Sequence, residues 1–334
     1  APAHAARKAI TTVFIGDILM LTAMIMLWVA YGTFSFAYIM QANAGAYAYI
    51  ALVLVLAAAY TKSAQFPFHE WLPDAMEGPT PVSAFLHSST MVKAGVFLVA
   101  ILLPLYMRFG MGWIIIMLGI ITSIIAISNA LAETHIKRIL AYSTVEDMGL
   151  MFVALGFGSL IGAMLLFVVQ AFYKALLFMN AGTIMKANNE EENIYRSYSP
   201  KSYKPLFITM LIGVLSLAGI FPVSGFFGRM GVEIAASSIY VYVVLLLIDF
   251  ASSVYIFRWL YVPMRKPKSA YEESEIMMNF DRTPKSMLVS QYILGAIVLA
   301  AGTLYFYMPK FLSGYIGSQM RIAIADSLIE STVV

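Results

Sequence analysis

Long apolar runs separated by short polar loops dominate this sequence. A helix needs about 20 apolar residues to cross the hydrocarbon core of a bilayer, because each residue advances it by only ~1.5 Å. Nine segments meet or approach that length, namely 10–31, 46–66, 80–105, 111–132, 140–157, 159–185, 205–236, 239–262 and 286–308. The pattern therefore predicts an all-α integral membrane protein of about nine transmembrane helices.

Two of these spans contain proline and glycine where an unbroken helix would not. The second span runs into residues 62–69 (KSAQFPFH), and the seventh contains residues 219–228 (GIFPVSGFFG). A proline inside a helix removes a backbone hydrogen bond, and the freed groups cannot be left facing lipid. Both breaks are therefore expected to line a cavity, and paired breaks of this kind point to an internal repeat and its binding site.

The repeat suggests how the chain is organised. The breaks lie five spans apart, and because five is odd, the two units would have opposite orientations in the membrane. We predict a single membrane domain over 1–334, with a partial first repeat of three spans in 1–105 and a second repeat of five spans in 111–262. Residues 263–334 hold a loop, the final span and a tail without an assigned function. Two spans of the first repeat are then missing upstream, so the chain is expected to be a fragment or a subunit completed by another chain.

Basic residues mark one side of the membrane, as expected for cytoplasmic loops. If the spans alternate, that side collects Arg7, Lys8, Lys137, Arg138, Lys186, Arg196, Lys201, Lys204, Arg265, Lys266, Lys268, Arg282 and Lys285. The inter-helix loops of the other side carry only Arg108. We therefore predict a multi-pass protein of the cytoplasmic membrane, with the N-terminus in the cytoplasm and the C-terminus outside.

Composition narrows the chemistry. The chain is 61% apolar and only 12% charged, against roughly 25% charged residues in soluble domains. It has no cysteine, which excludes disulfides, thiolate metal sites and iron–sulfur ligation, so any redox chemistry is expected to belong to partners. We expect no cofactor and no metal in this chain. The net charge of +3 is spread over loops and offers no surface for nucleic acid.

Four basic residues stand out within the predicted spans or at their breaks. A charge near the bilayer midplane costs at least ~2.5 kcal/mol, so each of them needs a reason. Lys93 lies deep in the third span, and Lys174 is central in the sixth, with Gln170 one turn earlier on the same face. Lys62 sits at the first break and Arg229 follows the second.

These residues are candidates for an ion pathway. A lysine inside the membrane can bind or release a proton as a carboxylate approaches or leaves it. His87, in the third span, titrates nearest neutrality and could pass protons to the lysines. Asp17, Gln170 and Asp249 are secondary candidates. The alternative reading is that all these side chains only hold helices together or reach to the membrane interface.

Three runs of residues resemble a known family. They are residues 62–95 (KSAQFPFHEWLPDAMEGPTPVSAFLHSSTMVKAG), 136–149 (IKRILAYSTVEDMG) and 170–178 (QAFYKALLF). The first closely resembles the signature of the antiporter-like subunits of respiratory complex I, Mrp sodium/proton antiporters and membrane-bound hydrogenases with their sulfur-reducing relatives. The resemblance is strong over about residues 55–185. The variant at 145–147 is more similar to the hydrogenase and Mrp branches.

The resemblance implies roles for single residues. Lys62 is similar to the lysine of the family's first broken helix, His87 and Lys93 to the relay positions that follow, and Lys174 to the central connecting lysine. Arg229 stands where the family often has lysine, and arginine releases its proton far less readily. Gln170 replaces a frequent histidine. The family's glutamate that pairs with the first lysine lies upstream of this chain, so coupling through Lys62 is expected to need a carboxylate from another chain or segment.

Two functions from different classes follow. The first is an ion-translocating subunit, for H⁺ or Na⁺, of a multi-subunit energy-converting complex, with other membrane subunits, lipid and, where the complex is redox-driven, a peripheral iron–sulfur arm as partners. The second is a non-conducting structural spacer, which Arg229 and the truncated first repeat permit. A stand-alone secondary transporter is disfavoured, because no polar constellation of substrate size is evident. The sequence leaves the choice of H⁺ or Na⁺ and the direction of coupling open.

Overall fold

The computed structural model describes residues 2–35, 38–39, 45–88, 90–199, 203–265, 270–303 and 307. Within these ranges the chain is almost entirely helical and has no strand, apart from one isolated bridge between His135 and Asn193. The tail 310–334 and the basic residues Lys201, Lys266 and Lys268 lie outside the described residues.

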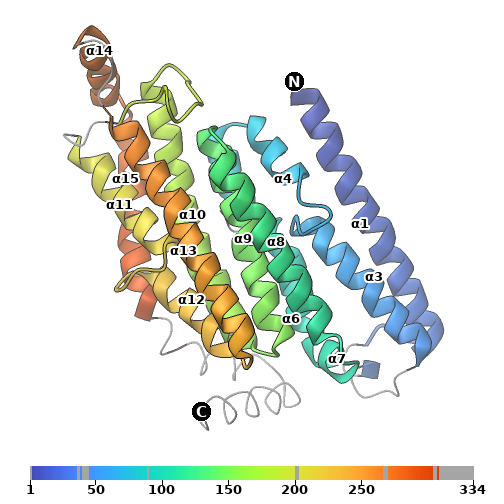
Figure 1. The fold of residues 1–334 in the computed structure, drawn as a ribbon. Helices are drawn as coiled ribbons and strands as arrows, with labels where there is room; N and C mark the ends of the chain where they lie inside the picture. The colour runs from blue at the N-terminus through green and yellow to red at the C-terminus, as the bar shows by residue number, and fades with distance from the viewer. Residues whose placement is uncertain are drawn as a thin grey trace.

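The helices run up and down side by side as one bundle (Figure 1). Its longer members are α1 (Pro2–Tyr31), α3 (Ala46–Lys62), α8 (Gly112–Ala132), α9 (Ile136–Gly156), α10 (Leu160–Ala187), α11 (Lys204–Leu217), α12 (Ser224–Ala235), α13 (Ile239–Tyr261) and α15 (Lys285–Ala300). Shorter helical segments are α4 (Trp71–Asp74), η1 (Ala75–Glu77), α5 (Thr80–Ser88), α6 (Lys93–Ile101), α7 (Leu103–Arg108), η2 (Val262–Met264), α14 (Ala270–Asp281) and η3 (Ala301–Thr303).

Seven helical stretches of the described residues are long and apolar enough to cross a membrane. The helices α3 and α11 are apolar but shorter, because each ends at one of the two predicted breaks. Together they account for the predicted spans, which confirms an all-α membrane fold with broken helices.

The first break separates α3 from α4. Its freed backbone groups find partners inside the protein: the amide of Phe66 donates to Thr122 Oγ1 on α8 at 3.1 Å. The hydroxyl of Ser63 donates to the carbonyl of Val92 at 2.6 Å. The break therefore faces protein, as the bilayer requires of irregular backbone.

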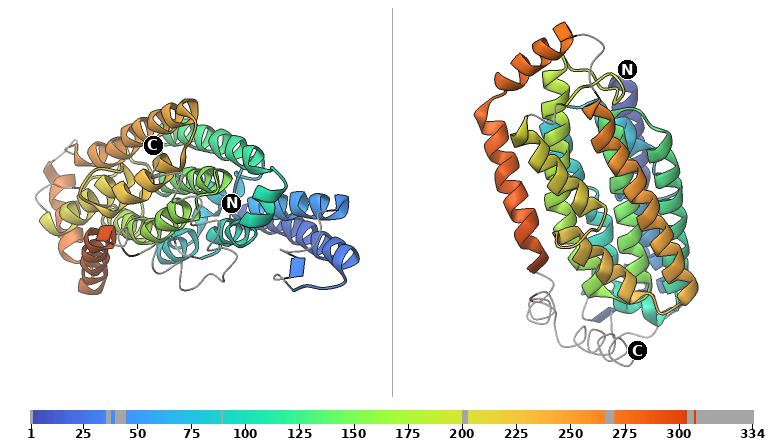
Figure 2. Two further views of the ribbon diagram at one scale, coloured as in Figure 1. Left: turned by 90° about the horizontal axis from the view of Figure 1, so that it is seen from below. Right: turned by 60° about the vertical axis from the view of Figure 1, so that its left-hand side comes forward.

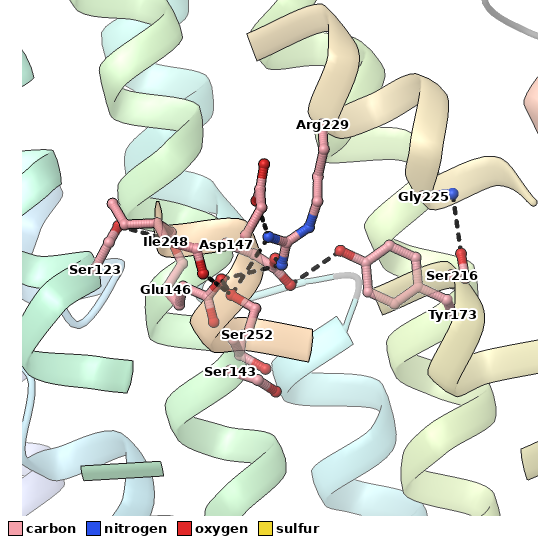
Figure 3. A network of polar contacts seen from close by, with 12 residues as sticks. Ser123, Ser143, Glu146, Asp147, Tyr173, Ser216, Gly225, Arg229, Ile248 and Ser252 are labelled. Atoms are coloured by element: carbon pink, nitrogen blue, oxygen red, sulfur yellow. Dashed lines mark hydrogen bonds and ion pairs between the residues drawn. The ribbon is translucent and has the colours of Figure 1, made fainter. Parts of the chain in front are cut away.

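The second break separates α11 from α12. Ser216 and Gly225 on its two sides are buried, whereas Ile220, Phe221 and Pro222 at its centre are exposed. The amide of Gly225 donates to Ser216 Oγ at 3.0 Å (Figure 3). Gly219 has φ +66° within this break, a conformation that suits glycine. The helices that precede the two breaks, α3 and α11, run in opposite directions (Figure 1).

A third interruption was not predicted from the sequence. The span read as continuous over 80–105 is divided, because α5 ends at Ser88 and α6 begins at Lys93. The hydroxyls of Ser88 and Thr90 donate to carbonyls of the preceding turn, at Ala84 and Phe85 respectively. Side-chain hydroxyls that compete for backbone carbonyls weaken a helix without any proline. Lys93 thereby stands at the start of a helix and not in the middle of one.

The helix α9 forms the centre of the bundle. In an apolar 18-residue stretch of α9, 94% of the residues are buried, against 61% in α10 and 11% in α1. Figure 2 and Figure 1 agree in placing α1 and α3 at one edge of the bundle. Polar groups on α9 therefore have protein on all sides, whereas α1 exposes large apolar side chains such as Phe14, Leu21 and Val29.

Candidate functional site

Two adjacent acidic residues lie in the middle of α9. Glu146 and Asp147 both have fully buried side chains, with 0% exposure. A carboxylate in such surroundings costs several kcal/mol unless it is paired and hydrogen-bonded. Cations and hydroxyls from α10, α12 and α13 provide the pairing.

Asp147 binds the predicted central lysine. Lys174 on α10 lies 2.9 Å from Asp147 Oδ2 and also donates to Ser143 Oγ at 2.6 Å. The hydroxyl of Tyr173 donates to the same carboxylate at 3.0 Å (Figure 3). Arg229 Nη2 approaches the other carboxylate oxygen to 3.3 Å. Asp147 thus stands between two cations that come from different helices.

Glu146 has its partners on α12 and α13. It accepts hydrogen bonds from Arg229 Nη2 at 3.0 Å and from the hydroxyl of Tyr255 at 2.5 Å. The hydroxyl of Ser252 also donates to it, and Arg229 Nη1 pairs with Asp249 on α13. Figure 3 shows the Arg229 side chain reaching from α12 toward Glu146 and Asp147. One buried guanidinium therefore meets three carboxylates.

The second break makes room for this arginine. A Cβ atom at Gly219 would lie 2.9 Å from Arg229 Cδ, so only glycine lets the arginine stem pass. The interruption that the sequence shows as Gly219 and Pro222 therefore places a cation beside the acids of α9.

Lys93 contacts α10 two helical turns before Lys174. Its ammonium, on a side chain 1% exposed, donates to the carbonyl of Phe167 on α10 at 2.5 Å and stands 4.8 Å from the centre of that ring. Phe167 precedes Lys174 by seven residues, or about 10 Å along the helix axis. Gln170 occupies the same face between them, and its two buried amide atoms have no hydrogen-bond partner among the described residues.

Lys62 has a carboxylate partner within this chain. Its ammonium lies 2.6 Å from Asp17 Oδ1 on α1, with side-chain exposures of 31% and 54%. Gly16 permits this contact, because a Cβ atom there would lie 1.8 Å from Thr61 Oγ1. Asp17 on α1 therefore gives Lys62 a carboxylate partner within this chain.

His87 stands apart from the lysines. It is 3% exposed, and its ring centre lies 6.3 Å from that of Phe178. No hydrogen bond joins it to Lys93 or Lys174 in the described part of the chain, and Nδ1 has no partner there. His87 and Asp17 line the same cavity of about 350 Å³, between α1, α5 and the segment 71–78. The structure therefore groups His87 with the Asp17 and Lys62 pair.

Ion pairs hold the loop that follows the first break. Lys8 on α1 donates to Glu70 at 2.8 Å and to Asp74 at 2.9 Å. The hydrogen bond from Lys8 lowers the pKa of Glu70, and partial burial lowers the pKa of His69 in the same loop. Arg138 on α9 also reaches Asp74, at 3.8 Å. These contacts tie α1, the loop and α9 together at the end of the bundle where the N-terminus lies (Figure 1).

Asp147 joins Lys174 to Arg229, and Arg229 contacts Glu146 and Asp249 directly. Sequence reasoning selected neither Glu146 nor Asp147. Glu146 and Asp147 appeared in the sequence only as part of a family motif. Yet both fall inside the predicted span 140–157, so the rule that singled out the lysines applies equally to them. Lys93 and Lys62 lie outside this network of direct contacts.

Comparison with known proteins identifies relatives. A sequence model of the family described as "NADH:quinone oxidoreductase/Mrp antiporter, TM" matches residues 2–254. NADH-quinone oxidoreductase subunit L of Campylobacter jejuni is 39% identical over 291 residues, which cover 82% of this chain and 48% of that protein. The chloroplast NAD(P)H-quinone oxidoreductase subunit 5 of Arabis hirsuta is 38% identical over 247 residues, covering 68% of this chain and 33% of that protein.

A solved structure has the same fold. The Mrp complex from Dietzia sp. DQ12-45-1b contains a chain that matches with a TM-score of 0.72 and 22% identity, covering 98% of this chain and 43% of that one. At this identity the match supports the fold alone. The present chain spans half or less of the length of the relatives it matches.

Proposed function

This chain belongs to the family of membrane subunits shared by NADH:quinone oxidoreductases and Mrp antiporters, and on that premise we propose that it moves protons or sodium ions within a multi-subunit energy-converting complex. The observation that carries the proposal is the fully buried pair of Lys174 and Asp147, at 2.9 Å, in a network that continues to Arg229. A buried pair that only stabilised the fold could be replaced by apolar packing without loss. A further buried cation, Lys93, contacts α10 at Phe167 and favours transport.

The proposed pathway runs across the bundle from one helix break to the other. It begins at the Asp17 and Lys62 pair, passes Lys93 and Gln170, and reaches Lys174 with Asp147. Each lysine can exchange its proton when a neighbouring charge changes, because its charged state depends on that neighbour. The ammonium of Lys93 contacts α10 at the carbonyl of Phe167, seven residues before Lys174, so both lysines meet the same helix.

Hydration of this row is supported by its unpartnered polar atoms. Gln65 Oε1, His87 Nδ1 and both amide atoms of Gln170 are buried and have no hydrogen-bond partner in the described part of the protein. Buried polar groups are normally satisfied, and ordered water is a common partner.

Arg229 has a different role in this proposal. A guanidinium stays protonated in proteins, so Arg229 acts as a fixed charge that holds Glu146, Asp147 and Asp249. The same observation favours the second candidate, a non-conducting spacer. In that case Arg229 blocks proton transfer because it does not release its proton. Substitution of the lysines separates the two functions.

The test uses the full-length protein in its membrane complex, reconstituted in vesicles. Lys174→Ala and Lys93→Ala should reduce ion uptake to background, measured with a pH-sensitive dye and with radioactive sodium, while the complex still assembles. Lys174→Arg should also fail, because it keeps the ion pair with Asp147 but does not release a proton. Lys186→Ala, at an exposed position near the end of α10, is the matched control and should behave as wild type.

Normal assembly with undiminished uptake in the three variants of Lys93 and Lys174 would favour the spacer. The two uptake measurements also distinguish H⁺ from Na⁺. Identification of the subunits that co-purify shows whether the complex contains an iron–sulfur redox arm.

A further inference from the structure

Glu146 and Asp147 are adjacent on α9 but bind different helices. Successive residues of a helix point about 100° apart, so neighbouring side chains meet different partners. Asp147 Oδ2 lies 2.9 Å from Lys174 Nζ of α10. Glu146 Oε2 accepts a hydrogen bond from the hydroxyl of Tyr255 on α13 at 2.5 Å. Arg229 of α12 contacts both acids, so these two pairings meet at one guanidinium (Figure 3).

Arg229 divides its donors between separate carboxylates. Its Nη2 donates to Glu146 Oε1 at 3.0 Å and to Asp147 Oδ1 at 3.3 Å, and its Nη1 pairs with Asp249. The third nitrogen, Nε, is buried and has no hydrogen-bond partner in the described part of the protein. A guanidinium binds a carboxylate most strongly through two parallel N–H groups. No carboxylate of the described residues receives two N–H groups from Arg229, so other contacts hold it in this divided position.

Glu146 supplies that hold. Its Oε1 accepts the shorter of the two hydrogen bonds from Arg229 Nη2. The carboxylate itself is fixed by two hydroxyls of α13, those of Tyr255 and Ser252, which lie one turn apart on that helix. All three side chains are fully buried, which shields these hydrogen bonds from bulk solvent. Two hydroxyls of α13 therefore fix Glu146, and Glu146 in turn fixes Arg229.

Asp147 is the carboxylate for which Arg229 and Lys174 compete. A two-pronged pairing of Arg229 with Asp147 would need both carboxylate oxygens, including Oδ2, which now binds Lys174. The 3.3 Å contact of Nη2 with Oδ1 already places Arg229 beside this acid. The shorter contact with Glu146 keeps the guanidinium on the other side. Glu146 thereby leaves Asp147 to Lys174.

We infer that Glu146, fixed by Tyr255 and Ser252, is a positioning residue that keeps Arg229 from displacing Lys174 at Asp147. The inference rests on the proposed ion-translocating function, in which Lys174 needs Asp147 as the carboxylate that governs its charge. No hydrogen bond or ion pair joins Glu146 to Lys174 among the described residues. Glu146 therefore acts on the lysine through Arg229.

High-resolution electron cryomicroscopy of the assembled Glu146→Gln complex tests this arrangement. Glutamine keeps the shape of Glu146 without its charge, so Arg229 should bind both oxygens of Asp147, and Lys174 Nζ should move beyond hydrogen-bond range of Asp147 Oδ2. Glu275→Gln, which changes an exposed carboxylate on α14, is the control and should leave these contacts unchanged. An unaltered contact between Lys174 and Asp147 in the Glu146→Gln complex would overturn the inference.

Ion uptake in vesicles supplies the second readout. Glu146→Gln should lower the rate several-fold while the complex still assembles, and Glu146→Asp, which keeps the charge, should restore part of it. A purely structural role would lower assembly and leave uptake per assembled complex normal, which would contradict the inference. If Lys174→Ala abolishes uptake while Glu146→Gln transports like wild type, the positioning role is wrong and the proposed function stands. If Lys174→Ala transports normally, the proposed function itself fails, whatever position Arg229 takes.

Discussion

Arg229 shows how one side chain can organise a buried site. Its two terminal nitrogens contact Glu146, Asp147 and Asp249, which lie on α9 and α13. The planar guanidinium presents several donors in fixed directions, so it can serve more than one carboxylate at once. Arg229 therefore couples the geometry of three helices to one charge, and its loss should affect stability as well as transport.

The stability of the protein should fall when this cation is removed. Arg229→Met leaves three carboxylates with a lost partner, and breaking a buried ion pair costs about 3–5 kcal/mol. Arg229→Lys should give an intermediate loss, because an ammonium keeps the charge but not the fork of donors. Unfolding by a denaturing detergent in mixed micelles measures the difference. Arg196→Met, at an exposed position, is the control, and a stable Arg229→Met protein would show that the pairing contributes little.

The cost of placing a charge in the membrane explains which site residues could be predicted from the sequence. Lys93 and Lys174 were recognisable because a charge inside an apolar run is rare and costly. The link between Lys174 and Arg229 was not recognisable, because it depends on carboxylates of α9 that meet α10 and α12 only in the folded bundle. Glu146 and Asp147 satisfied the same criterion as the lysines.

At the scale of the helix, bilayer thickness made most elements predictable. The expected span 159–185 corresponds to α10 at Leu160–Ala187, and the span 239–262 to α13 at Ile239–Tyr261. Proline and glycine marked two breaks correctly. The third break, between α5 and α6, has no proline and depends on hydroxyl groups that bond back to the preceding turn. Such hydroxyl groups disrupt a helix less than proline does, and they leave no distinct pattern in the sequence.

The contact between α8 and α9 should tolerate no added side chain. Cβ atoms built at Gly119 and Gly149 would each lie 2.7 Å from the carbonyl oxygen of the other glycine. Small residues allow membrane helices to approach this closely. Gly149→Ala should therefore push α9 away from α8 at a cost of about 1–3 kcal/mol, as overpacking does elsewhere.

The same variant should affect transport, because α9 carries Glu146 and Asp147 within a turn of Gly149. Detergent unfolding and ion uptake in vesicles measure the two effects. Gly45→Ala is the matched control, since a Cβ atom there meets nothing within 4 Å. If Gly149→Ala is as stable and active as Gly45→Ala, the close approach of α8 and α9 is not required.

At the scale of the whole molecule, the candidate charged residues form one group in the centre of the bundle and another at its edge. The network around Arg229 is enclosed by α9, α10, α12 and α13, whereas Asp17 and Lys62 lie on the edge helices α1 and α3 (Figure 1). A carboxylate that is 54% exposed on a membrane-spanning helix needs a polar neighbour in the assembled state. This fits a role within a larger membrane assembly. The partial first repeat over 1–105 and the second over 111–262 remain predictions.

The orientation of the molecule can be tested because the chain has no cysteine. Basic residues at the end of the bundle that holds the N-terminus should keep that end in the cytoplasm. Tyr195→Cys lies in the loop between α10 and α11 at that end, and Ser237→Cys lies between α12 and α13 at the opposite end (Figure 1). In intact cells, a membrane-impermeant maleimide should label the Ser237→Cys variant and not the Tyr195→Cys variant. Both should react after permeabilisation. The reverse labelling would overturn the orientation.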